Sequence, residues 1–155
     1  MGAMKTYEFE VVGRPVPKGS MKAYMAKGAR FPIITHDNES TKPWQATVAA
    51  TAHAVCQGNV TRAPVAIEIE CFFGYRKSDF GTGRNAGALK PSAPTHHTTK
   101  PDADKLGRCI GDALKGVVYA DDSQVVEITV RKAYTLEHEH ARIRVTVLEG
   151  CEACQ

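Results

Sequence analysis

Val65-Ala-Ile-Glu-Ile-Glu-Cys-Phe-Phe73 is the stretch of sequence that decides the fold. Val65, Ile67 and Ile69 are apolar, as are Cys71 and Phe73, whereas polar or small residues occupy most positions between them. This period of two predicts a strand from Pro64 to Phe73 that buries one face. It is the most clearly defined strand of the chain, and the elements on either side of it predict an α+β fold.

Outside this strand, period-two alternation predicts further strands, and apolar residues at three-to-four spacing predict amphipathic helices. The strands are expected at 6–12, 21–25, 31–35, 125–134 and 141–148, and the helices at 41–57 and 104–115. Short connections pair the second strand with the third, and the last two with each other, as antiparallel hairpins. The order predicts a single α+β domain with a mixed β-sheet and two main helices on its faces.

The length of 155 residues fits one compact core. We expect the folded domain to span 5–149, with residues 1–4 as the remnant of an expression tag and 150–155 as a C-terminal tail. Apolar residues form 43% and charged residues 24% of the chain, which is typical of a globular protein. No apolar run approaches the roughly 20 residues of a membrane helix. These features predict a cytoplasmic protein that does not bind membranes.

The five cysteines are an odd number in apolar or terminal contexts, which argues against a disulfide framework. Cys71 and Cys109 lie inside apolar patterns and are expected in the core. Cys151 and Cys154 have the spacing of half a zinc site, but no second pair or histidine cluster completes it.

Residues 74–100 combine four glycines and two prolines with five lysines or arginines, and show no sustained periodicity. A loop of this length inside a compact domain is unusual and is often functional. One interpretation is a solvated insertion. The other is a basic flap that closes over phosphates.

Two clusters of aspartates flank the second predicted helix. Asp102 and Asp104 lie where a loop becomes this helix, and Asp121 and Asp122 follow it after the connection 116–120. Carboxylate oxygens are the ligands that Mg²⁺ prefers, so the clusters are candidates for one metal site if the connection folds back. The same residue types also suit helix caps and turns. The pattern alone leaves both interpretations open.

Three motifs in order resemble a known family. They are Lys100-Pro-Asp-Ala-Asp-Lys-Leu-Gly-Arg108, Asp112-Ala-Leu114 and Asp121-Asp-Ser-Gln-Val-Val126. Together they resemble the RusA family of Holliday-junction resolvases, whose pattern runs Pro-Asp-x-Asp-Asn-Leu-x-Lys, Asp-Ala-Leu and Asp-Asp-x-Gln-Val. The segment Arg14-Pro-Val-Pro-Lys18 also resembles the opening of phage-encoded members.

The resemblance implies that Asp102, Asp104 and Asp122 hold the metal, with Asp121 as a weaker candidate. The position of the family's essential lysine falls on Arg108, and Lys105 replaces the family's asparagine. An arginine does not give up its proton, so Arg108 can orient or neutralise a phosphate but cannot act as a general base. Lys105 either shares this cationic role or only contacts DNA.

The implied activity is Mg²⁺-dependent hydrolysis of Holliday junctions, with Mn²⁺ as an alternative ion and products carrying a 5′-phosphate and a 3′-hydroxyl. The implied partners are branched DNA and a second copy of the chain, in a bacterial or phage-infected cell and without a small-molecule cofactor. A homodimer suits the two-fold symmetry of a four-way junction. Basic residues expected to contact DNA phosphates are Arg14, Lys18, Lys22, Arg76, Lys77, Arg84, Lys90 and Lys100.

Three alternative functions would use the same residues. The first is a broader endonuclease acting on flaps or replication forks. The second is a non-catalytic module that binds branched DNA, whose acids are only caps and turns. The third is a metal-dependent phosphatase of small molecules, which would leave the basic loops without a role.

Overall fold

The computed structural model describes residues 4–36 and 39–149, apart from the side chains of residues 21, 22, 35 and 36. The expected tag remnant is therefore almost entirely outside the described residues. So are the expected tail 150–155, the Cys151–Cys154 pair within it and the side chain of Lys22.

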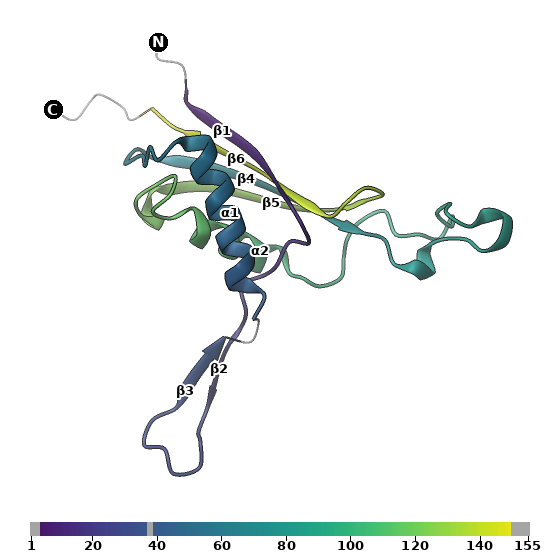
Figure 1. Ribbon diagram of the computed structural model, residues 1–155, viewed down its shortest axis with the longest axis horizontal. Coiled ribbons are helices and arrows are strands. Elements are labelled where there is room, and N and C mark those ends of the chain that lie inside the picture. The colour runs from purple at the N-terminus through teal and green to yellow at the C-terminus, as the bar shows by residue number, and fades with distance from the viewer. Residues whose placement is uncertain (1–3, 37–38, 150–155) are drawn as a thin grey trace.

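The core of the fold is a four-stranded mixed sheet (Figure 1). Its order is β1 (Thr6–Val12), β6 (His140–Val147), β4 (Val65–Gly74) and β5 (Val125–Thr135). Strand β6 is antiparallel to β1 and β4, whereas β5 is parallel to β4. The alternating residues of β4 are buried as expected, and they place this strand in the interior of the sheet.

The prediction that the last two strands form a hairpin is wrong, because β4 lies between β5 and β6. The connection at 136–139 crosses over the end of β4, a distance of two strand spacings, or about 9.6 Å. Four residues span this easily, so a short connection does not require neighbouring strands. The parallel pair instead joins β4 to β5 through a helix, which is the usual connection for parallel strands.

Helices α1 (Thr41–Cys56) and α2 (Ala103–Leu114) cover one face of the sheet (Figure 1). The core between these layers includes Trp44, Val48, Leu106, Ile110, Ile67, Ile143 and the free cysteines Cys56, Cys71 and Cys109. The expected core positions of Cys71 and Cys109 are thus confirmed. In the described part of the chain, neither helix has the length and apolar composition needed to cross a bilayer.

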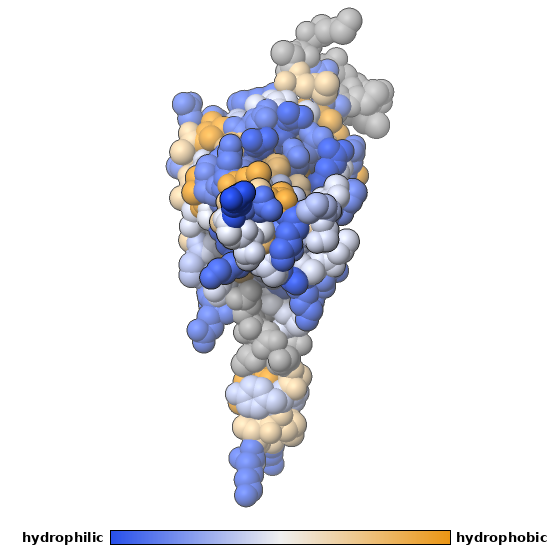
Figure 2. Space-filling view, turned by 90° about the vertical axis from the view of Figure 1, so that its right-hand side faces the viewer, coloured by the Kyte–Doolittle hydropathy of each residue, from blue (hydrophilic) through white to orange (hydrophobic). Residues whose placement is uncertain are grey.

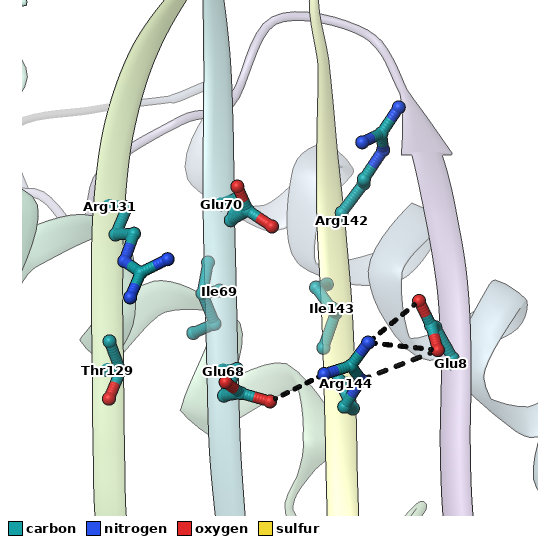
Figure 3. A pocket seen from close by; sticks show the side chains of 9 residues that line it. All are labelled: Glu8, Glu68, Ile69, Glu70, Thr129, Arg131, Arg142, Ile143 and Arg144. Atoms are coloured by element: carbon teal, nitrogen blue, oxygen red, sulfur yellow. Dashed lines mark hydrogen bonds and ion pairs between the residues drawn. The ribbon is translucent and has the colours of Figure 1, made fainter.

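The other face of the sheet carries alternating rows of charge (Figure 3). Arg144 on β6 lies between Glu8 on β1, at 3.4 Å, and Glu68 on β4, at 3.1 Å. Because these side chains are about half exposed, each pair contributes little to stability. Their main effect is to keep this face hydrophilic.

Strands β2 (Met21–Tyr24) and β3 (Ile33–His36) form the predicted hairpin, which projects away from the domain (Figure 1). Tyr24 pairs with Ile33, and Ala23 with Ile34, so apolar side chains lie on both faces of the two strands. Figure 2 shows this projection with hydrophilic side chains at its tip. An isolated hairpin is marginally stable in water, and exposed apolar patches often mark interaction sites.

The long loop between β4 and α2 contains two short 3₁₀ helices, Lys77–Asp79 and Gly83–Asn85. Its chain folds back on itself, since Gly81 N–H donates to the carbonyl of Ala88 and Lys90 N–H to that of Asp79. The loop extends beyond the end of the sheet (Figure 1).

Candidate active site

The two acids at the start of α2 are exposed and are not used to build the helix. Asp102 occupies the N-cap position, but its side chain makes no capping hydrogen bond. Asp104 lies in the first turn and makes no hydrogen bond or ion pair with the residues that the structure describes. The negative charge of both is favoured by the positive end of the helix dipole. Asp104 therefore remains available to a ligand, whereas Asp102 forms an exposed ion pair with Lys105.

The connection after α2 folds back because Tyr119 is buried beneath it. Its hydroxyl donates to the carbonyl of Gly111 at 2.7 Å, and burial raises the pKa of the phenol so that it keeps its proton. The N–H of Ala120 donates to the carbonyl of Thr61, which ties the connection to the segment before β4. This anchoring returns the chain to the sheet directly before the second acidic cluster.

Asp104 and Asp122 consequently line one cleft of about 410 Å³. Arg108 and Asp112, one and two turns further along α2, line the same cleft. Its remaining wall is mainly apolar and comprises Ile67, Gly107, Gly111, Tyr119, Val125, Ile128 and Val130. An apolar cleft with a few converging charged groups is the usual form of a ligand site.

Gly107 allows this cleft to form, because α2 and β5 approach closely at this position. A Cβ atom on residue 107 would lie 2.8 Å from the Cγ2 atom of Val130. A larger residue would push the helix, with Asp104 and Arg108, away from the sheet.

The two acids of the second cluster have different surroundings. Asp121 caps the short helix Asp122–Gln124 and accepts a hydrogen bond from the N–H of Ser123 at 3.0 Å. That hydrogen bond, followed by the charge of Lys115, lowers the pKa of Asp121. Asp122 has no such role in the backbone and faces the cleft. The capping interpretation therefore describes Asp121, whereas the side chain of Asp122 is paired with Lys115 and does not cap the backbone.

The three aspartates that the family pattern selects are not gathered into one tight group. In the described part of the chain, the oxygens of Asp102, Asp104 and Asp122 do not all lie within 4.8 Å of one another, and Asp102 lies outside the lining of the cleft. Like charges repel, and exposed carboxylates can rotate to relieve that repulsion. Their oxygen donors nevertheless fit Mg²⁺, which accepts one to three carboxylates and keeps water for its other positions.

Three cations surround these acids, and one was not selected from the sequence. Lys105 lies 3.5 Å from Asp102 and 3.3 Å from the hydroxyl of Ser20. Arg108 lines the cleft. Lys115 lies 3.2 Å from Asp122 and 3.5 Å from Asp121, and the hydrogen bond to Asp122 raises its pKa. From the sequence, Lys115 has only the pattern of a cation at a helix C-terminus.

Asp112 is held by a partner from the N-terminal region. Its carboxylate lies 2.6 Å from the ammonium group of Lys18, whose backbone N–H donates to the carbonyl of Lys105. This pair places the base of the β2–β3 hairpin against α2. It also leaves Lys18, expected to contact phosphates, beside the cleft.

Lys132 on β5 is a second residue that the sequence pattern did not single out. Its ammonium group donates to the carbonyls of Thr99 and Pro101, both at 2.9 Å. These two bonds hold the chain immediately before Asp102. Lys132 is therefore a positioning residue for the acidic end of α2.

We expect the substitution Lys132→Met to lower the junction cleavage that the resemblance implies roughly tenfold to a hundredfold, because small displacements of reacting groups carry costs of this size. The methionine keeps the apolar stem but removes both hydrogen bonds. The measurement is single-turnover cleavage of a junction by each variant. Arg131→Met, on the opposite face of the same strand, is the control, and equal activity of the two variants would contradict this role.

A second hollow, of about 570 Å³, gathers three of the residues expected to bind DNA. Arg14, Arg76 and Lys100 line it together with the aromatic rings of Tyr75 and Tyr134. The two tyrosine rings stack with their centroids 4.4 Å apart. Exposed cations beside aromatic rings can contact both phosphates and bases.

His97 also lines this hollow and is only 7% exposed. Adjacent histidines in a loop rich in threonine and proline are usually solvated, but His97 is buried and stacks on Phe73. Burial lowers its pKa. Lys77, Arg84 and Lys90 are exposed further along the loop and do not line either hollow.

The chain is similar to known proteins over most of its length. The family model described as "Endodeoxyribonuclease RusA" matches residues 13–147, which include both acidic clusters and most of the sheet. The chain is also similar to the "Uncharacterized protein YqaN" of Bacillus subtilis (strain 168). The two are 28% identical over 151 residues, which cover 94% of this chain and 98% of the relative.

Proposed function

Because the chain belongs to the RusA family of endodeoxyribonucleases, an assignment that implies resolution of Holliday junctions, we propose that it is a Mg²⁺-dependent resolvase. The observation that carries the proposal is the cleft that brings Asp104 and Asp122 together beside Arg108. Asp104 and Arg108 lie on α2, whereas Asp122 follows this helix in the chain. A pair of acids used only as caps would not need to face one cavity.

In this proposal Asp102, Asp104 and Asp122 hold the ion, and Asp121 supports them from the cap of the following turn. When bound there, Mg²⁺ or Mn²⁺ supplies an activated water and offsets negative charge on the phosphate. Arg108 orients the scissile phosphate and remains protonated throughout. Lys105 balances the charge of Asp102. Hydrolysis then leaves a 5′-phosphate and a 3′-hydroxyl.

The path proposed for DNA runs from this cleft toward the hollow with Arg14, Arg76 and Lys100. Lys18 borders the cleft, while Lys77, Arg84 and Lys90 extend the positive surface along the loop. Contacts with phosphates release counterions, so binding should weaken steeply as salt increases. The backbone of Lys22 lies in β2, at the base of the hairpin, and we propose that this residue also contacts DNA.

Paired incision requires two active sites, and we propose that two copies of the chain provide them. The support comes from the β2–β3 hairpin, whose apolar side chains Tyr24, Ile33 and Ile34 are 41–61% exposed in one protomer. A second copy would cover these faces and match the two-fold symmetry of a four-way junction. The basic loop at the tip, with Lys27 and Arg30, remains free for DNA.

The decisive experiment is a nicking assay on a synthetic mobile four-way junction, with and without Mg²⁺. The expected result is paired cuts only when Mg²⁺ is present, with slower cleavage of matched fork, flap and duplex substrates. Equal rates on all four substrates would favour the broader structure-selective endonuclease. Junction binding without Mg²⁺-dependent nicking would favour the non-catalytic binding module.

Lys115 should compete with the metal, because its ammonium group already neutralises Asp122. We expect Lys115→Gln to lower the Mg²⁺ concentration for half-maximal cleavage by a few-fold, since the pair is exposed and individually weak. The measurement is a Mg²⁺ titration at fixed junction concentration. An increased requirement for Mg²⁺ would show instead that Lys115 helps to bind the substrate.

A further inference from the structure

A second group of metal-ligating side chains lies at the end of the sheet, away from the aspartates. Glu10 is near the end of β1, His138 lies in the connection between β5 and β6, and His140 begins β6. One ligand atom from each lies within 4.8 Å of the other two. In the part of the chain that the structure describes, no other three acidic, histidine or cysteine side chains are gathered in this way.

The strand register brings these residues together. His140 is paired with Val12 on β1 and with Phe72 on β4, and its ring stacks on Phe72 at 4.4 Å between centroids. Nε2 of His138 lies 3.2 Å from Oε1 of Glu10, and Nε2 of His140 lies 4.0 Å from Oε2 of the same carboxylate. Both imidazoles therefore direct a nitrogen toward one carboxylate.

His140 has the hydrogen-bonding geometry of a metal ligand. It is 3% exposed, and its Nδ1 atom lies 2.8 Å from the carbonyl oxygen of His138. That carbonyl can only accept, so Nδ1 carries a proton, and in the neutral imidazole Nε2 presents its lone pair. Nε2 is buried and has no hydrogen-bond partner. Such a buried acceptor is costly unless something binds it.

We propose that Glu10, His138 and His140 form a binding site for a Zn²⁺-class divalent cation, distinct from the aspartate site. Zn²⁺ binds imidazole nitrogens and carboxylate oxygens at about 2.0–2.2 Å, so its tetrahedral ligands lie roughly 3.3–3.5 Å apart. The separation of 3.2 Å already matches this spacing, and that of 4.0 Å needs only a small movement. Water would occupy the fourth position.

The donor set separates this site chemically from the proposed Mg²⁺ site. Imidazole suits Zn²⁺, Cu²⁺ or Ni²⁺, whereas Mg²⁺ prefers oxygen. Glu10 supplies the oxygen ligand of the set, and its carboxylate is 40% exposed, so a cation can reach it from solvent. Arg142 is a competing cation at 3.7 Å from Glu10, but its side chain is 57% exposed and can turn toward solvent.

The bound ion would fix the end of the sheet from which the proposed DNA-binding segments leave. Glu139, between the two histidines, pairs with Arg14 at 2.7 Å and accepts from the N–H of Gly74 at 3.0 Å. Its carbonyl accepts from the N–H of Gly13. A cation joining β1 to residues 138 and 140 would therefore stabilise two chain segments where they leave the sheet. One begins at Gly13 and leads to the β2–β3 hairpin, and the other begins at Gly74 and forms the long basic loop.

The test is a Zn²⁺ titration of the full chain against a chromophoric chelator, with thermal unfolding followed in parallel. All variants carry Cys151→Ser and Cys154→Ser, so that the terminal thiols cannot bind the ion. The expected result is one Zn²⁺ per chain and an unfolding temperature that rises with zinc. His138→Gln should weaken zinc binding at least about tenfold, as the loss even of a supporting group does at metal sites.

Two controls make the result specific. His53→Gln alters an exposed histidine on α1 and should leave zinc binding unchanged, and Asp104→Asn should also leave it unchanged. The parent protein, which carries only the two cysteine substitutions, should show visible absorption when it binds Co²⁺. This absorption should be absent in His138→Gln. His140→Gln should behave like His138→Gln if it folds, but exposed His138 gives the decisive variant. Zinc binding that is absent in the parent, or equal in His138→Gln, would overturn the site.

Discussion

Asp104→Asn should abolish junction cleavage while leaving junction binding intact or stronger. Asp104 is exposed and has no partner among the described residues, so the substitution does not remove a stabilising contact. It removes a proposed metal ligand and a charge that repels phosphate. A metal ion contributes several kcal/mol to a phosphoryl-transfer transition state, which corresponds to a loss of about a thousandfold or more.

The measurement pairs single-turnover cleavage with a gel-shift titration of the same junction, at matched salt. Asp112→Asn is the matched control, because it removes the same charge from the same helix and cleft. Since Asp112 is held by Lys18, this control should lose less than about tenfold in rate. An active Asp104→Asn enzyme would refute the proposed metal site, and so would an equal loss in both variants.

The elements of this fold were largely predictable because they follow local patterns. The alternation of β4 and the three-to-four spacing of α1 and α2 identify these elements within a few residues. The pairing of the strands was harder to predict from the sequence. The short connection at 136–139 suggested neighbouring strands, but the energetic gain of placing apolar β4 in the interior depends on the whole sheet.

The residues of the candidate site also differ in how far the sequence could identify them. Some belong to motifs along the chain, whereas others depend on contacts between distant segments. The resemblance selected Asp104 and Asp122, and the structure places both in one cleft. The roles of Lys115 and Lys132 depend on contacts with groups that folding brings near, so no spacing along the chain identifies them. His140 is a similar case, since only the packing of β6 against β4 buries its ring.

The strongest effect on assembly is expected from the double variant Phe31→Ser/Ile34→Ser in the β2–β3 hairpin. These side chains are 77% and 61% exposed in one protomer, so their loss should not weaken the fold of a single chain. In the proposed homodimer four such side chains are buried, and each contributes about 1.5–3 kcal/mol when fully covered. Even partial burial predicts a rise in the dimer dissociation constant of about a thousandfold.

Sedimentation over a range of concentrations measures this change, and a supercoiled plasmid with an extruded cruciform reports its consequence. The parent should produce linear plasmid through paired cuts, whereas the double variant should produce nicked circles. Leu136→Ser, which alters a residue that is 71% exposed beyond β5, is the control and should behave like the parent. If the double variant remains dimeric, the hairpin is not the dimer contact. Its apolar faces would then have to meet another partner, because two strands alone cannot bury them.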